Sequence, residues 1–222
     1  MAITINHYTG FEPDKNLLAK LLKVHKDTLL FKDAMAFVNI KKDLIKPKFI
    51  LKRFEIYKVY DTGLVIGDIK LNSKTLVKML NINAPIFVFA GTGGKEIELY
   101  ADDLTDYFEK YVLDQMAYMG CLYSLEAMRQ TLKNTYKIEN YISFAPGSLP
   151  DWDVIETKKI FELMGEEYKK IGLRILDSGM VDPLKTISGI LFESNDVFNS
   201  CQLCNRENCP TRLRSYVSKL QI

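Results

Sequence analysis

Ala84-Pro-Ile-Phe-Val-Phe-Ala-Gly-Thr-Gly-Gly94 contains the longest apolar run of the chain and ends in a cluster of glycines. The run Ala84 to Ala90 predicts a buried central strand. A glycine cluster after such a strand suits either a phosphate cradle or a tight turn into a helix. Because the lysine of a P-loop and the full dinucleotide fingerprint are both absent, we expect the turn.

The segments around this strand predict both strands and long helices. The expected strands are 49–60, 64–71, 84–90, 173–178 and 185–192, and the expected helices are 12–29, 75–80, 102–133 and 154–170. Asp102 or Asp103 is expected to cap the longest helix, and Asp151 or Asp153 the last one. Since strands and helices do not alternate strictly, the sequence predicts an α+β fold.

Composition excludes several classes of protein. The chain has 222 residues and a net charge of +2, with 47% hydrophobic and 26% charged residues, so it is neither disordered nor a disulfide scaffold. Its near balance of charge does not indicate nucleic acid as a partner. No run approaches the roughly 20 apolar residues of a membrane span, and no secretion signal is visible. We therefore expect a cytoplasmic protein.

The C-terminal segment is a candidate metal centre. Cys201, Cys204 and Cys209 form a Cys-x2-Cys-x4-Cys-Pro pattern. A Cys-x2-Cys pair lets two thiolates reach one tetrahedral centre, and a third cysteine five residues on can return to it. Soft thiolates select zinc or an iron–sulfur cluster, of which a 4Fe-4S cluster is our first expectation and zinc the alternative.

Three cysteines leave one coordination position open. Cys121 is the remaining thiol of the chain and therefore a candidate fourth ligand. His7, His25 and an exogenous ligand are the other candidates. A tail without metal, whose thiols oxidise readily, is the further alternative.

Three motifs in the C-terminal half of the chain indicate a family resemblance. They are Ser143-Phe-Ala-Pro-Gly-Ser-Leu-Pro-Asp-Trp152, Ile171-Gly-Leu-Arg-Ile-Leu-Asp-Ser178 and Met180-Val-Asp-Pro-Leu-Lys-Thr-Ile-Ser-Gly189. Their order resembles the activation (reactivation) domain of vitamin B12-dependent methionine synthase, and the cysteine tail resembles free-standing homologues of that domain. The clear match covers about residues 141–212.

The resemblance implies a fold and a division of the chain. The family fold is a mainly antiparallel twisted sheet flanked by long helices. It implies one α+β domain over residues 1–198, whose first 40 residues are helical and poorly matched, and a cysteine-rich metal-binding tail over residues 199–222.

The resemblance also implies a ligand and a partner. In methionine synthase this domain binds S-adenosylmethionine, docks on the cobalamin domain and supports reductive methylation of Co(II). The implied cleft residues here are Ser143, Ala145, Pro146, Gly147, Ser148, Ser188 and Gly189. The family's Arg-x-x-Pro-Gly-Tyr pattern has lost its arginine to Ser143 and its tyrosine to Ser148. Because serine cannot pair with the ligand's carboxylate as arginine does, we expect weak binding of S-adenosylmethionine.

Three functions follow from these observations. The first is an accessory protein of corrinoid chemistry that docks on a cobalamin-binding protein or cobalamin-dependent methyltransferase and helps to reduce its cobalt. The corrinoid would be carried by the partner or bound directly. The second is a methyl-donor domain that binds S-adenosylmethionine. The third is a non-enzymatic binding module stabilised by zinc.

Overall fold

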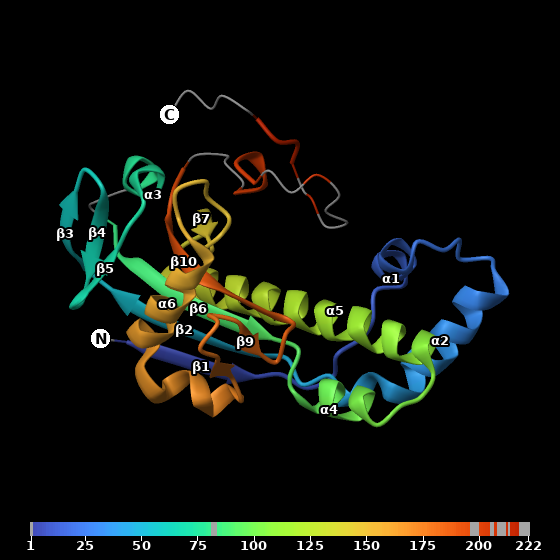
Figure 1. The fold of residues 1–222 in the computed structure, drawn as a ribbon. Helices are drawn as coiled ribbons and strands as arrows, with labels where there is room; N and C mark the ends of the chain where they lie inside the picture. Colours follow the sequence, from blue (N-terminus) through green and yellow to red (C-terminus); the bar gives the residue numbers. More distant parts are fainter. Residues whose placement is uncertain are drawn as a thin grey trace.

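The centre of the molecule is a five-stranded antiparallel sheet with the strand order β1-β2-β6-β10-β7 (Figure 1). The structure is a computed structural model that describes residues 2–80, 84–195, 200–204, 207, 212 and 214–217. The strands are β1 (Ile3–His7), β2 (Lys48–Phe54), β6 (Ile86–Thr92), β10 (Thr186–Glu193) and β7 (Tyr141–Phe144). The α+β class and the mainly antiparallel sheet are confirmed.

Strand β6 lies in the middle of this sheet, and all seven of its residues are buried. Successive side chains of a strand point to opposite faces, so each face of β6 needs its own cover. Helix α6 (Thr157–Met164) packs on the face that carries Val88 and Ala90. Helix α5 (Tyr107–Thr131) packs on the face that carries Phe87 and Phe89. The two helices thus lie on opposite faces of the sheet (Figure 1).

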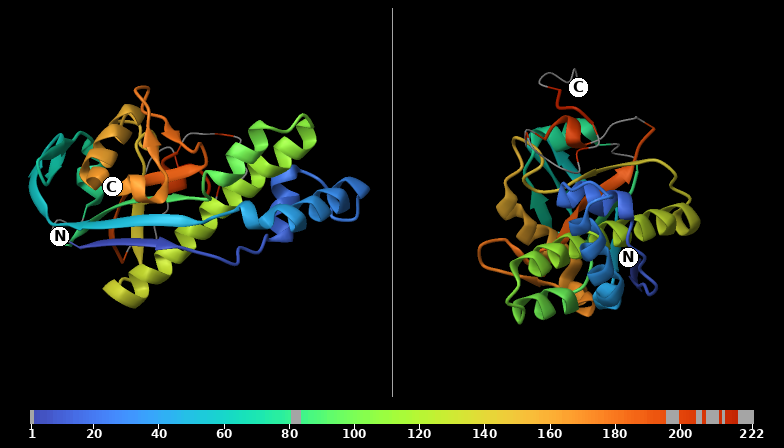
Figure 2. Two further views of the ribbon diagram at one scale, coloured as in Figure 1. Left: turned by 90° about the horizontal axis from the view of Figure 1, so that it is seen from below. Right: turned by 90° about the vertical axis from the view of Figure 1, so that its right-hand side faces the viewer.

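A helical extension continues beyond one end of the sheet (Figure 2). It contains α1 (Lys15–Leu22), α2 (Leu29–Lys41), η1 (Lys42–Leu44), α4 (Glu96–Asp102) and the first half of α5. Their apolar faces form a separate buried cluster around Leu18, Val38 and Met116. Helix α5 takes part in this cluster and in the core of the sheet, so it joins the two regions.

Two small sheets complete the fold. The first joins β3 (Ile56–Tyr60), β4 (Gly63–Ile66) and β5 (Ile69–Leu71), and the second joins β8 (Arg174–Ile175) to β9 (Val181–Asp182). The remaining elements are α3 (Lys74–Met79), a π-helical turn η2 (Leu132–Tyr136) and the short 3-10 helices η3 (Val154–Glu156), η4 (Gly165–Ile171) and η5 (Ser200–Gln202). In the part of the chain described here, no helix is both long and apolar enough to cross a membrane.

The predicted glycine turn after β6 is a close packing contact with α5. A Cβ on Gly93 would lie 2.5 Å from the carbonyl oxygen of Ala117. A Cβ on Gly120 would lie 3.0 Å from the Cα of Gly93 and 2.5 Å from the Cγ2 of Ile45. Glycine at 93 and 120 therefore lets the backbone of α5 approach the end of β6.

Lys52 fastens β2 to α6. Its side chain is only 7% exposed, and its Nζ donates hydrogen bonds to the carbonyls of Leu163 (2.7 Å) and Met164 (3.3 Å) at the end of α6. Burial lowers the pKa of Lys52, although the charge of Glu167 opposes that shift. The ammonium satisfies helix-end carbonyls at the negative end of the helix dipole.

Three strand predictions were wrong in their boundaries, and of the expected strand 173–178 only Arg174–Ile175 forms β8. The alternating segment 49–60 is two strands, because β2 ends at Phe54 and the chain then enters the small sheet with β3. The segment 64–71 is likewise divided into β4 and β5 by a tight turn at Gly67. Alternation predicts which residues face the core, but it does not tell which sheet they join.

Three helix predictions also needed correction, two of them because of a cap. The expected helix 12–29 ends at Leu22, and α2 begins after Thr28, whose hydroxyl accepts a hydrogen bond from Phe31 N. The expected helix from Asp102 is instead α4 followed by α5, and α5 begins after Asp106, whose carboxylate accepts from Phe108 N and Glu109 N. The helix 154–170 is α6 flanked by 3-10 turns. The proposed domain boundary at 198/199 lies outside the described residues.

We expect Gly93→Ala to lower the free energy of unfolding by about 2 kcal/mol, because the added methyl group must displace backbone atoms of α5. Urea denaturation followed by circular dichroism measures this change. The control is Thr105→Ala, an exposed residue of the loop between α4 and α5, which should change the same quantity by less than about 0.5 kcal/mol. Equal stabilities for Gly93→Ala and the wild type would contradict the close contact.

Candidate functional site

The Pro-Gly loop, residues 145–153, follows β7 directly and is closed by hydrogen bonds of its own. Ser148 Oγ donates to the carbonyl of Ala145 (2.6 Å) and accepts from the amide of Ala145 (3.1 Å). The amide of Gly147 donates to the carbonyl of Trp152 (2.7 Å). Because these contacts occupy the Ser148 hydroxyl, this residue shapes the loop.

The structure brings the two predicted cleft segments together. Strand β10 pairs with β7, with Ile190 opposite Phe144. A Cβ on Gly189 would lie 2.1 Å from the carbonyl oxygen of Phe144, so Gly189 is directly beside the start of the Pro-Gly loop. Residues 143–148 and 188–189 are therefore spatial neighbours.

Two predicted cleft side chains nevertheless lie on opposite faces of the sheet. Ser143 is opposite Leu191, whose side chain packs in the cluster under α5. Ser188 is opposite Ala90, whose side chain packs in the cluster under α6. Residues opposite each other in a sheet share a face, so Ser143 and Ser188 cannot line one cleft with their side chains.

A depression of about 620 Å³ lies on the outer side of the Pro-Gly loop. Its lining residues are Gly147, Leu149, Pro150, Asp151, Trp152, Asp153 and Val154. Trp152 is only 1% exposed and belongs to the core beneath the loop, so it packs and does not offer a ring face to a ligand.

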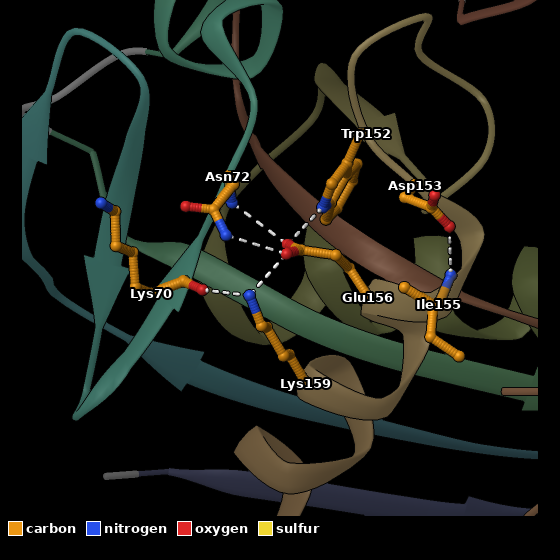
Figure 3. A network of polar contacts seen from close by, with 7 residues as sticks. All are labelled: Lys70, Asn72, Trp152, Asp153, Ile155, Glu156 and Lys159. Carbon is orange, nitrogen blue, oxygen red and sulfur yellow. Dashed lines mark hydrogen bonds and ion pairs between the residues drawn. The ribbon is translucent and has the colours of Figure 1, made fainter. Parts of the chain in front are cut away.

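Glu156 holds the Pro-Gly loop against the end of the β3-β4-β5 sheet through a buried polar network (Figure 3). Its carboxylate accepts hydrogen bonds from Trp152 Nε1 (3.2 Å), Asn72 N (3.1 Å) and Asn72 Nδ2 (3.0 Å). Lys159 Nζ approaches the same carboxylate at 2.5 Å and also donates to the carbonyl of Lys70 (2.9 Å). Burial alone would raise the pKa of Glu156, but the contacts with Lys159 and Asn72 outweigh it and lower this pKa.

Asp151 and Asp153 have the capping roles that acidic residues before a helix suggest, but on different helices. Asp153 accepts a hydrogen bond from Ile155 N (2.9 Å) and so caps the turn before α6, as predicted. Asp151 accepts from the hydroxyl of Ser73 and from Thr75 N, both at 2.9 Å, and so supports the start of α3. Asp151 and Glu156 thus give the loop two carboxylate links to neighbouring elements.

We expect Glu156→Gln to lower the free energy of unfolding by about 1–3 kcal/mol at pH 7, because buried donors lose an ionised acceptor. The folded pKa of Glu156 is lowered, so its stabilising contribution is complete above the unfolded pKa of about 4.5 and is lost as the pH falls through the folded pKa. The difference between variant and wild type should therefore shrink below about pH 4.5. Denaturation at several pH values measures it.

The matched control is Glu162→Gln, an exposed residue of α6, which should change stability by less than about 0.5 kcal/mol. A Glu156→Gln variant with the same stability as the wild type at pH 7 would contradict the structural role of the network.

A second depression, of about 400 Å³, runs along the C-terminal half of α5 and was not predicted. We call it the α5 pocket. It is lined by Tyr8, Tyr123, Glu126, Ala127, Gln130, Thr131, Asn134 and Thr135. Tyr8 comes from the segment after β1, and the others come from α5 and η2. The i, i+4 spacing of Tyr123, Ala127 and Thr131 was available in the sequence, but methionines and aromatics at that spacing favour core packing.

The electrostatics of the α5 pocket centre on Glu126. Its carboxylate accepts from Arg129 Nε (2.8 Å) and NH2 (2.6 Å) and from Gln130 Nε2 (2.8 Å). The hydrogen bond from Arg129 is the largest cause that lowers the pKa of Glu126, and the one from Gln130 adds to it. Burial raises the pKa of Tyr141. The charge of Arg129 opposes this shift, and the charge of Glu126 adds to it. Ser143 lies two residues along β7 from Tyr141 and so on the same face of the sheet.

The structure does not bring the predicted cysteine ligands into one group within the residues it describes. Cys121 is fully buried in α5, and its Sγ donates to the carbonyl of Gly91 (3.2 Å). Burial raises the pKa of the Cys121 thiol to about 12, which disfavours the thiolate that binds a metal. Cys201 and Cys204 are half-buried in and after η5, whereas Cys209 lies outside the described residues.

Arg212 connects the two ends of the Cys-x2-Cys turn. Its NH1 donates to the carbonyl of Cys201 (2.8 Å), and its NH2 donates to the carbonyl of Cys204 (3.1 Å). Among the described residues, no three histidine, cysteine or carboxylate side chains form a group that could hold a metal ion. The donor set of Cys201 and Cys204 still fits a soft metal, because both thiols come from one short turn.

The fold is an α+β domain with a mainly antiparallel sheet between a long helix and a short one. In a comparison with solved structures, the chain is similar to the MetH reactivation domain, whose crystal structure contains AdoHcy. The TM-score is 0.64 at 17% sequence identity, and the match covers 89% of this chain and 80% of that chain. No protein family and no curated protein matches this chain by sequence.

Proposed function

We propose that this protein is an accessory protein of corrinoid methyl-transfer chemistry. It docks on a cobalamin-binding protein or a cobalamin-dependent methyltransferase and supports reductive reactivation of the cobalt. The observation that carries the proposal is the structural likeness to the MetH reactivation domain over 89% of this chain. One fold can host several functions, so the fold alone does not specify this one. The proposed role is taken from the reactivation role named for that neighbour.

The test uses the anaerobically purified protein and a cobalamin protein in its Co(II) form. We expect the two proteins to elute together in size-exclusion chromatography. We also expect the absorbance of Co(II) to decay faster with a low-potential reductant when this protein is present. Separate elution together with an unchanged rate of reduction, across a panel of cobalamin proteins, would contradict the proposal.

The tail supplies the electron-transfer part of the same proposal. Cys201, Cys204 and Cys209 would hold a 4Fe-4S cluster, with zinc as the alternative. A low-potential iron–sulfur cluster suits one-electron reduction of Co(II). Arg212 holds both ends of the Cys-x2-Cys turn, and its positive charge favours thiolates nearby. Because Cys121 is buried elsewhere with a raised pKa, an exogenous or partner group is the better fourth ligand.

We expect Cys204→Ala to remove the metal from the tail, since two remaining thiolates bind a soft metal far more weakly than three. Cys121→Ala is the control and should retain the metal. Iron, zinc and sulfide analysis with the ultraviolet–visible spectrum measures both variants. A broad band near roughly 400 nm with iron and sulfide identifies a cluster, whereas about one zinc per chain identifies a structural staple. Full metal content in Cys204→Ala would refute the assignment.

A second proposal concerns a small ligand. The neighbour was solved with AdoHcy, and the α5 pocket here offers tyrosine rings, amides and hydroxyls in about 400 Å³, a usual size for a small-molecule site. We propose that the α5 pocket takes an adenosyl-type ligand. Ser143 shares the sheet face of Tyr141, whose phenol is close enough to Glu126 to be influenced by its charge.

We expect the wild type to bind S-adenosylmethionine weakly and Ser143→Arg to bind it about tenfold more tightly. An arginine on this face supplies a charge-assisted partner for the carboxylate, and a gain of about 1.4 kcal/mol corresponds to that factor. Titration calorimetry measures both affinities, and Ser143→Ala is the control without a charge. Micromolar binding by the wild type would overturn this expectation.

A further inference from the structure

The two edges of the central sheet are covered differently. Strand β7 forms one edge, and η5 of the cysteine tail lies against it. Strand β1 forms the other edge and pairs with β2, along the outside of the sheet (Figure 2, left). Among the residues that the structure describes, no strand pairs with the outer side of β1. An unpaired edge of this kind offers a row of backbone N–H and C=O groups to a further strand.

The register of β1 on β2 shows which backbone groups lie on the outer side. The carbonyl of Ala2 accepts a hydrogen bond from the amide of Arg53 (3.0 Å), and the amide of Tyr8 donates to the carbonyl of Pro47 (2.9 Å). Hydrogen-bonded pairs alternate along an antiparallel ladder, so the even-numbered residues of β1 turn their backbone groups toward β2. The residues that turn theirs outward are Ile3, Ile5 and His7.

Strand β1 is held on both of its faces and carries nothing that blocks pairing. The hydroxyls of Thr4 and Tyr136 lie 3.1 Å apart on the side of α5, and Ile5 packs against the core on the side of α6. Protected edge strands commonly carry lysine, proline or a bulge. The strand Ile-Thr-Ile-Asn-His has neither residue, and its register with β2 is continuous. This edge therefore suits an added strand.

The strand that fits this edge is β1 of a second copy. An antiparallel copy related by a twofold axis at Ile5 places the two Ile5 residues opposite each other, and Ile3 opposite His7 of the second copy. The outward N–H and C=O groups of these residues then meet in hydrogen-bonded pairs. Thr4 lies opposite Asn6 of the second copy, so no like charges face each other. Isoleucine and threonine also favour strands.

We infer that this protein forms a twofold dimer in which the β1 strands of two copies pair antiparallel and join their central sheets. The inference goes beyond the proposed corrinoid function and does not depend on it. A contact that is the same on both copies closes at two chains. Because the shared strand has five residues, the interface is small, and the dimer should be in equilibrium with the monomer at micromolar concentrations.

The first measurement is sedimentation velocity of the full chain at about 5–500 µM, a range that spans weak specific association. We expect the mass to rise from one chain to two, with a dissociation constant of about 10–100 µM. A monomer at every concentration would overturn the inference.

Hydrogen exchange of single amides, followed by nuclear magnetic resonance at both ends of this range, shows which surface a dimer uses. The amides of Ile3, Ile5 and His7 should exchange slowly only at the high concentration, because only the second copy pairs with them. The amides of Thr4 and Asn6 should be slow at both concentrations, since they face β2. A dimer whose three outward amides exchange as fast as in the monomer would overturn the inference.

Two variants of one edge residue test the backbone contact. Ile3→Pro removes an outward amide at the first position of the strand, where proline is tolerated, so pairing with β2 is kept. We expect its dissociation constant to rise at least about tenfold. Ile3→Lys, at a side chain that is already 38% exposed, adds a protective edge charge and should weaken the dimer as well.

The matched control is Ile3→Val, which keeps both the amide and the β-branched shape. Its dissociation constant should stay within about twofold of the wild type. Circular dichroism shows whether each variant is folded. A folded Ile3→Pro variant that dimerises as tightly as the wild type would contradict the pairing of the β1 strands.

Discussion

Burial of β6 on both faces is the constraint on which the rest of this structure depends. A strand that buries all seven residues must be covered by an element on each side and paired on each edge. Here β2 and β10 pair with its edges, while α5 and α6 cover its faces. The glycines at 93 and 120 let α5 approach the end of this strand, and Lys52 fastens α6 to its neighbour β2. The helical extension follows, because α5 continues past the sheet and needs a partner for its first half.

The same two-sided sheet separates the candidate sites. The Pro-Gly loop leaves β7 and is held by Asp151 and Glu156, so its carboxylates are occupied by structure. The α5 pocket lies on the other side, where α5 ends in a π-helical turn. Such turns occur often at functional sites, since they widen the helix and redirect its side chains. A ligand in the proposed α5 site would therefore leave the Pro-Gly loop uncovered.

The proposed corrinoid function joins these parts through the cysteine tail. Leu203 packs against the core beneath α6, so the Cys-x2-Cys turn is anchored to the folded domain near β7. Arg212 shapes that turn through the carbonyls of Cys201 and Cys204. An electron carrier anchored in this way would have a defined position relative to a docked partner.

The sequence by itself determined the α+β class, the central strand and the resemblance carried by the Pro-Gly loop. These features depend on local patterns, namely apolar runs, capping side chains and turn residues. It also predicted Cys201, Cys204 and Cys209 as soft metal ligands, a prediction that depends only on their spacing. Only the tertiary structure decided that Ser143 and Ser188 face opposite sides, that Cys121 is buried away from the tail, and that Tyr8 meets Tyr123. Strand register and long-range packing decide which side chains share a face and which distant residues meet. No local pattern in a single sequence specifies either of them.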